Sequence, residues 1–138
     1  MRLPATAERV PLHTAPDVNE RIRRRTLGNI ERACAAGPAV IRARLAALDH
    51  EWDIERAIEA NAATVALIGT ALGAFGNRRF LLLPAAVCLF LAQHAIQGWC
   101  PPVPILRRLG FRTEREIFEE RLALEAALEL GATAPLSQ

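Results

Sequence analysis

The chain has 138 residues, of which 51% are hydrophobic and only 5% aromatic, and its formal net charge is +2. A charge this close to neutral disfavours a nucleic-acid-binding protein, whose surface is usually strongly basic. Every side chain counted as Lys or Arg is arginine, and nearly all the charge lies in the two flanks, whereas the middle, from about residue 57 to 100, is mostly apolar. Soluble domains alternate polar and apolar residues within each element, so this segregation indicates a membrane protein.

The N-terminal half divides into two predicted regions. Residues 1–17 contain three prolines and no hydrophobic period, which predicts a flexible arm without an apolar signal sequence. We therefore expect insertion through internal apolar segments. Residues 18–52 form a predicted amphipathic helical region. It is broken at Gly37-Pro38, because glycine favours the position after a helix and proline the first position of the next.

Residues 53–100 predict a helical hairpin that crosses the membrane. Two uncharged runs, 62–75 and 80–92, flank a four-residue polar turn. Extended to their natural boundaries, the two helices reach about 18 and about 21 residues, enough to span a bilayer. The first helix carries small residues near one face, which allow close approach of the second. These residues are Ala62, Ala66, Gly69 and Gly73. The alternative is a soluble helical bundle.

Residues 101–138 predict an interfacial segment and a C-terminal amphipathic helix. Thr113 and Glu116 form a capping-box motif that starts this helix. Its apolar face needs a partner, which could be lipid, the N-terminal helices or another subunit. In the interfacial segment we expect Arg107, Arg108 and Arg112 to contact lipid headgroups. The expected fold class is all-α, a transmembrane two-helix hairpin flanked by amphipathic helices.

Arginine counts predict the orientation, since cytoplasmic loops are enriched in basic residues. More arginines lie beside the outer ends of the two spans than in the turn, where only Arg78 and Arg79 occur. We therefore expect a multi-pass protein of the bacterial inner membrane with both termini in the cytoplasm. The two turn arginines count against this orientation. The arginines on the opposite side are Arg42, Arg44, Arg56, Arg107, Arg108, Arg112 and Arg115.

Cys100 is a candidate reactive thiol. It stands at the predicted end of the second span, where a thiol whose pKa is lowered can react. The alternative is a small residue packed at a helix end. The three cysteines, Cys34, Cys88 and Cys100, are odd in number and far apart, so neither a disulfide framework nor a metal site is expected.

His94 is the one histidine of the predicted membrane region. It could ligate a cofactor such as haem, but a hydrogen bond to Asn61 or Glu59 on the partner helix is the simpler interpretation. Closure of the hairpin would bring polar side chains of both helices to one membrane face as a structural clasp. The predicted clasp consists of Glu59, Asn61, Gln93, His94 and Gln97.

A short motif carries a family resemblance. Gly98-Trp99-Cys100 ends the hairpin and is followed by a short apolar and basic stretch, 104–109. With these features residues 55–112 resemble the YgaP-like inner-membrane transmembrane family, a domain of unknown function that some members carry behind a rhodanese sulfurtransferase domain. The resemblance implies a membrane hairpin with a cysteine at its cytoplasmic end. None of the three cysteines has rhodanese-loop surroundings, so sulfurtransferase activity is not implied.

No phosphate-binding loop, nucleophile–base pair or carboxylate dyad stands out in the sequence, so we do not expect an enzyme or a cofactor. The predicted function is that of a structural, adaptor or accessory-subunit membrane protein. Its expected partners are the lipid bilayer and either further copies of itself or another membrane protein, and not nucleic acid. The alternatives are a thiol- or sulfur-handling protein that uses Cys100 and a cofactor-binding subunit that uses His94.

Overall fold

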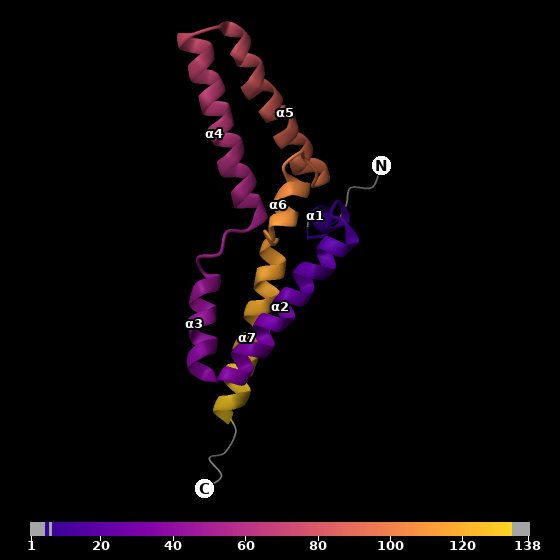
Figure 1. Cartoon of the computed structure of the whole chain (residues 1–138), viewed down its shortest axis with the longest axis vertical. Coiled ribbons are helices and arrows are strands. Elements are labelled where there is room, and N and C mark those ends of the chain that lie inside the picture. The colour runs from indigo at the N-terminus through magenta and orange to yellow at the C-terminus, as the bar shows by residue number, and fades with distance from the viewer. Residues whose placement is uncertain (1–4, 6, 134–138) are drawn as a thin grey trace.

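The computed structural model describes residues 5 and 7–133, and within them every regular element is a helix. Two of these helices form a long hairpin that projects from the remaining helices (Figure 1). The predicted all-α fold with a helical hairpin is confirmed. In chain order the elements are α1 (Arg9–Leu12), α2 (Pro16–Ala36), α3 (Pro38–Leu48), α4 (Ile54–Phe75), the 3-10 helix η1 (Arg78–Leu81), α5 (Leu82–Gln97), α6 (Val103–Leu109) and α7 (Glu114–Thr133).

The hairpin pairs α4 with α5 through a tight turn. Asp53 caps α4 by accepting a hydrogen bond from the backbone N–H of Arg56, at 2.6 Å. Near the turn the helices touch at Gly69, where a Cβ atom would lie 2.8 Å from Cδ of Pro84. A Cβ at Gly73 would lie 2.5 Å from a methyl carbon of Leu81. The close approach predicted from small residues is therefore confirmed at these two glycines.

Most of the hairpin surface is apolar and uncovered. Both arms are long and apolar enough to cross a membrane, yet only 17% of the apolar stretch of α4 and 6% of that of η1–α5 is buried. Phe75 is 93% exposed, and Leu67 and Leu82 are more than two-thirds exposed. A core helix of a soluble protein would bury such side chains, so the exposure favours membrane association over a soluble bundle.

Helices α2, α3 and α7 form a separate small bundle. Its core joins Ala33 of α2, Ile41 and Leu48 of α3, and Ile117 and Leu124 of α7. The N-terminal helices are thus the partner that the apolar face of α7 requires. The predicted capping box is present, because the Thr113 N–H donates to the Glu116 side chain at 2.8 Å and the Glu116 N–H to the Thr113 hydroxyl at 3.3 Å.

The described part of the expected flexible arm is folded. Val10 of α1 is 2% exposed and packs with Ile54, Cys100 and Val103 in a second core at the base of the hairpin. Gly98 allows α1 to pack this closely. Its φ is +77°, and any Cβ at this position would collide with Arg9. The expectation of a loose arm is therefore not met at α1 and at the start of α2, and residues 1–4 and 6 lie outside the described residues.

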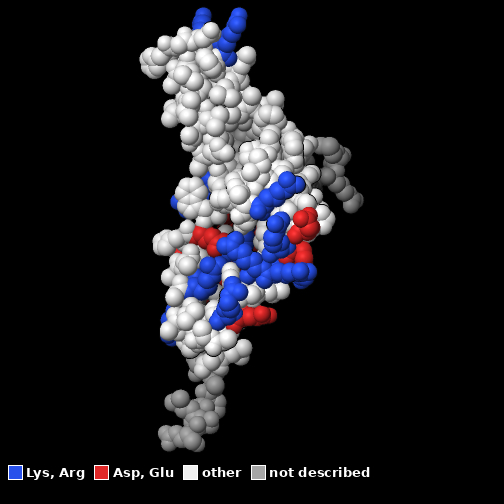
Figure 2. Space-filling model, viewed as in Figure 1, with Lys and Arg blue, Asp and Glu red and all other residues white. Residues whose placement is uncertain are grey.

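Charge is segregated in space as it is along the chain. On the face that Figure 2 shows, the hairpin carries almost no charged atoms except at its tip, where η1 contributes Arg78 and Arg79. A dense band of basic and acidic side chains crosses the molecule below the hairpin. This band lies at the junction between the hairpin and the α2–α3–α7 bundle. Among the described residues, three of its charged side chains are buried, namely Arg107, Arg112 and Glu120.

Candidate functional site

Two arginines and two glutamates form a charge-balanced cluster at the junction. Glu120 of α7 is fully buried and accepts hydrogen bonds from Arg44 of α3, at 2.7 Å, and from Arg112. Glu51 accepts from Arg112 at 2.8 Å and from Arg44 at 3.3 Å. The guanidinium of Arg112 also donates to the hydroxyl of Thr26 at 3.0 Å. We call Arg44, Glu51, Arg112 and Glu120 the junction network.

Arg107 forms a second buried pair beside the junction network. Its guanidinium donates to both oxygens of Glu116, at 2.7 and 2.8 Å, and to the backbone oxygen of Phe111 at 3.1 Å. It also reaches Thr14 and Asn19, at 3.1 and 2.8 Å, and so joins α6 to the beginning of α2. The Arg107 side chain is 1% exposed, and each of its nitrogen atoms donates to an acceptor of the protein. This bonding indicates a structural role for Arg107.

The expectation that Arg107 and Arg112 contact lipid headgroups was wrong. Both are almost completely buried, and of the three predicted arginines only Arg108 is exposed. The physical reason is the spacing of Glu116 and Glu120 on α7, one helical turn apart, which supplies a carboxylate for each guanidinium. A buried guanidinium requires such a partner, and this glutamate pair was the signal in the sequence.

The acids of these clusters stay ionised despite their burial. Burial is the largest single influence on Glu120 and would raise its pKa, but the bonds from Arg44 and Arg112 outweigh it, so the pKa lies below the ordinary 4.5. The same balance lowers the pKa of Glu116, where burial is opposed by Arg107 and Thr113. Because both folded-state pKa values are depressed, their stabilisation is complete above pH 4.5 and is lost as the pH falls further.

A third polar group closes the base of the hairpin. His94 of α5 is 3% exposed, and its Nε2 lies 2.6 Å from a carboxylate oxygen of Glu55 on α4. Arg9 of α1 lies 3.4 Å from the other oxygen of Glu55 and donates to the backbone oxygen of Ala95 at 2.7 Å. The two arms and α1 are therefore held together by one carboxylate.

The predicted polar clasp is only partly assembled. His94 does pair with a polar side chain of the other arm, but the partner is Glu55 and not Glu59 or Asn61, both of which are exposed. Glu55 and Glu59 are one helical turn apart, so the sequence pattern alone did not distinguish them. The remaining predicted members are the half-buried Gln93 and the exposed Gln97.

Cys100 lies at the base of the hairpin, next to the imidazole of His94. It is 2% exposed, whereas Cys34 and Cys88 are exposed. The Nδ1 atom of His94 is buried and lacks a hydrogen-bond partner of standard geometry among the described residues. With Nε2 taken by Glu55 and Nδ1 beside a thiol, neither ring nitrogen faces a space in which a haem could sit.

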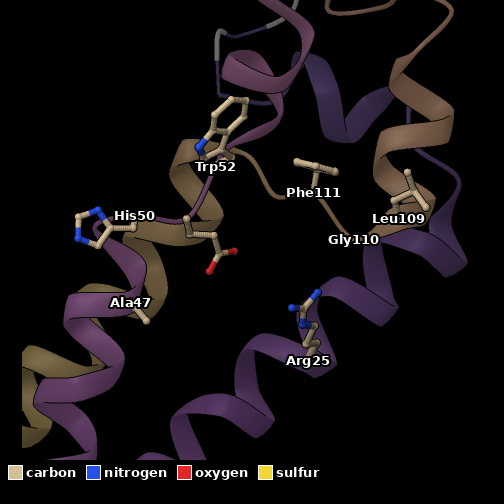
Figure 3. A pocket seen from close by; sticks show the side chains of 8 residues that line it. Arg25, Ala47, His50, Trp52, Leu109, Gly110 and Phe111 are labelled. Carbon is tan, nitrogen blue, oxygen red and sulfur yellow. The ribbon is translucent and has the colours of Figure 1, made fainter. Parts of the chain in front are cut away.

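Two hollows flank these groups. An apolar groove of about 280 Å³ lies between the arms of the hairpin, and Cys100 is part of its wall. An open pocket of about 380 Å³ lies below Trp52, with Arg25 of α2 rising toward Gly110 (Figure 3). Arg25 has no ion-pair partner among the described residues, and Trp52 is stacked by Arg56 at 4.6 Å from the ring centroid.

Metal ligands and similarity to known proteins are the remaining indicators of function for the groups described above. Within residues 5 and 7–133, no group of three or more His, Cys, Asp or Glu side chains is placed to hold a metal ion. The chain matches no protein-family model, no curated protein and no solved structure.

Removal of one acid from the junction network should destabilise the bundle strongly. For Glu120→Gln we expect a loss of about 3–5 kcal/mol in unfolding free energy, because the buried guanidinium of Arg112 and the half-buried guanidinium of Arg44 lose a full charge partner. The matched control is Glu119→Gln, whose exposed pair with Arg115 contributes less than about 1 kcal/mol. Thermal unfolding in mild detergent, followed by helical circular dichroism, measures both.

The same measurement at decreasing pH tests the ionisation of these acids. The wild-type protein should lose stability below pH 4.5, and Glu120→Gln should show a shallower loss, since one of the titrating groups is gone. Equal stability of Glu120→Gln and Glu119→Gln would contradict the assigned role of the junction network.

Proposed function

We propose that this chain is a membrane-anchored adaptor or accessory subunit, in which the α4–α5 hairpin crosses the bilayer and the α2–α3–α7 bundle binds a protein partner. The observation that carries the proposal is the long, uncharged and largely exposed apolar surface of the hairpin beside a compact charged bundle. Arms of 22 and 20 residues match the thickness of a bilayer. The resemblance to the YgaP-like family agrees with such a hairpin.

Contact with lipid headgroups, first expected of the buried arginines, falls instead to Trp52, Arg56 and Arg25. Trp52 immediately precedes the hairpin and is 46% exposed, a setting typical of interfacial tryptophan. Arg25 lines the same pocket as Trp52, and Arg108 is exposed on α6, so both guanidinium groups can pair with lipid phosphates. This boundary would hold the bundle against the headgroups.

The bundle offers one apolar groove that suits a protein partner. This groove, of about 540 Å³, runs between α2 and α7 and is lined by Ile22, Leu27 and Ile30 of α2 and by Ala123 of α7. Arg23 and Glu119 flank it with charges of opposite sign. An amphipathic helix of a second copy or of another membrane protein can bury its apolar face there.

No catalytic role is proposed for the junction network. Its two acids and two bases neutralise one another, and the pair formed by Arg107 and Glu116 does the same. Groups paired in this way bind no substrate without first breaking a buried ion pair, which costs several kcal/mol, of the order of 3–5. The buried charges therefore favour a structural role.

Insertion of the hairpin can be tested with one arginine. Leu67→Arg places a charge near the middle of α4 at a position that is 71% exposed, at a cost of roughly 2.5 kcal/mol or more in a bilayer. The wild-type chain should remain in the membrane pellet after carbonate extraction, and Leu67→Arg should lose most of its membrane-bound yield. Ala46→Arg, on the exposed side of α3, should behave as wild type. Extraction of the wild-type chain by carbonate would overturn membrane integration.

The topology follows from the arrangement of the helices. All described helices other than α4, η1 and α5 lie at one end of the hairpin, so a spanning hairpin leaves α1 and α7 on the same side. In a variant without the three native cysteines, a cysteine at Asn77 should react with an impermeant maleimide from the periplasmic side. Cysteine at Asp49 is the control and should react only after permeabilisation. The reverse pattern would place the bundle outside the cytoplasm.

The partner groove can be tested through the native mass. If the partner is a second copy, the purified protein should sediment as more than one chain in mild detergent. Leu27→Glu should then reduce the native mass to that of a single chain, because a charge enters the apolar wall of the groove. Ala43→Glu, on the exposed side of α3, is the control. A wild-type protein that is monomeric, and that copurifies with no other membrane protein, would refute the adaptor role.

A further inference from the structure

The base of the hairpin contains a cysteine, a histidine and a carboxylate in series. Glu55 bonds Nε2 of His94 at 2.6 Å, and the thiol of Cys100 lies beside the same imidazole. His94 and Cys100 are 3% and 2% exposed, and they come from different segments of the chain. Acid, imidazole and thiol in this order constitute the arrangement that activates a cysteine nucleophile in many unrelated folds.

The hydrogen bond to Glu55 defines what the imidazole can do. A carboxylate can only accept a hydrogen bond, so Nε2 carries the hydrogen and donates it to Glu55. In the neutral ring Nδ1 then bears the lone pair. This Nδ1 is the buried atom without a standard hydrogen-bond partner, and the thiol of Cys100 interacts with the same ring. A core histidine with a purely structural role would be expected to satisfy both nitrogens.

The groove beside Cys100 is suited to a chain of methylene groups. Its walls are almost wholly apolar, with Val65 and Ala62 of α4 facing Val87 and Phe90 of α5. It runs along the hairpin, on the surface that the proposed function places in lipid. On the other side of Cys100, the short helix α1 covers the base with Val10, which packs in the same core.

We propose that Cys100 is the acceptor of a long-chain fatty acyl group, held as a thioester, with the acyl chain lying in the groove between α4 and α5. The proposal rests on the membrane placement of the hairpin proposed above. The juxtamembrane position of Cys100 is one at which cysteine acylation is common. The apolar groove favours a long acyl chain over a short one, because burial of each additional methylene group in it is favourable.

The reaction is a transthioesterification and needs no oxidant or reductant. Nδ1 of His94 takes the proton of the Cys100 thiol, and the sulfur attacks the carbonyl carbon of an acyl thioester donor. A new S–C bond forms, the carbon–sulfur bond of the donor breaks, and the departing thiolate receives the proton from His94. Glu55 stabilises the imidazolium that exists between the two proton transfers.

The test uses the full-length protein purified in mild detergent and incubated with palmitoyl-coenzyme A. Intact-mass spectrometry should show one palmitoyl adduct, which peptide mapping assigns to Cys100 and which neutral hydroxylamine removes. Cys100→Ser should abolish the adduct. Cys88→Ser is the matched control, because Cys88 is exposed on α5 far from His94, and it should leave the adduct unchanged.

Two further variants separate activation from structure. His94→Gln and Glu55→Gln should slow the acylation by at least tenfold, in line with the usual contribution of a general base. Ala62→Phe should obstruct the groove and slow palmitoylation while leaving acetylation by acetyl-coenzyme A within about twofold. A thermal unfolding curve of each variant identifies any that fails to fold, and the wild-type mapping tests the site independently of the variants.

Three results would overturn the proposal. These are the absence of an adduct at Cys100 in the wild-type protein, equal labelling of Cys34 and Cys88, and an unchanged rate in a folded His94→Gln variant. Because the reaction is run in detergent, its failure leaves the carbonate-extraction result intact. Conversely, extraction of the wild-type chain from membranes would refute the proposed function even if Cys100 were acylated in micelles.

Discussion

Charge neutralisation at the junction is the constraint on which the rest of the structure depends. Arg112 is 2% exposed and Glu120 is fully buried, and neither could be buried without the other. Their cluster includes Arg44 and Glu51, so α3, the α3–α4 segment, the α6–α7 turn and α7 meet at one point. A hydrophobic core of this small size gives little directional information, whereas four ions with defined hydrogen bonds fix a single arrangement.

The junction also sets where the hairpin stands. Ile54 is the first residue of α4, and its N–H donates a hydrogen bond to the backbone oxygen of Arg112 at 2.8 Å. Arg112 thus binds the bundle through its side chain and the hairpin through its backbone. Arg107 and Arg9 make comparable connections to α7 and α5. The two arms of the hairpin and the bundle are consequently joined by hydrogen bonds as well as by apolar contact, and this supports the view of one integrated unit.

Local signals in the sequence predicted several helix ends, but not α1, which lies in the expected arm. The Gly37-Pro38 break and the Thr113 capping box depend on neighbours within a few residues, and both are found in the structure. Long-range pairing was harder to foresee. The buried state of Arg107 and Arg112 depends on acids of two other segments, and the choice of Glu55 over Glu59 depends on the rotation of α4. A basic residue beside a span was interpreted as interfacial because its partners were not evident from local sequence.

The wide sequence separation within the junction network has a consequence for biogenesis. Arg112 bonds to Glu51, 61 positions earlier, and Arg44 bonds to Glu120, 76 positions later, so the hairpin lies between the partners. A ribosome delivers the chain from the N-terminus, and until α7 emerges Arg44 and Glu51 lack half of their counter-ions. Both arms of the hairpin are therefore synthesised before the bundle can close, and assembly of α7 is the step that completes the fold. A chain truncated before Glu120 would keep the hairpin but leave the bundle open, with Arg44 short of one of its two acidic partners.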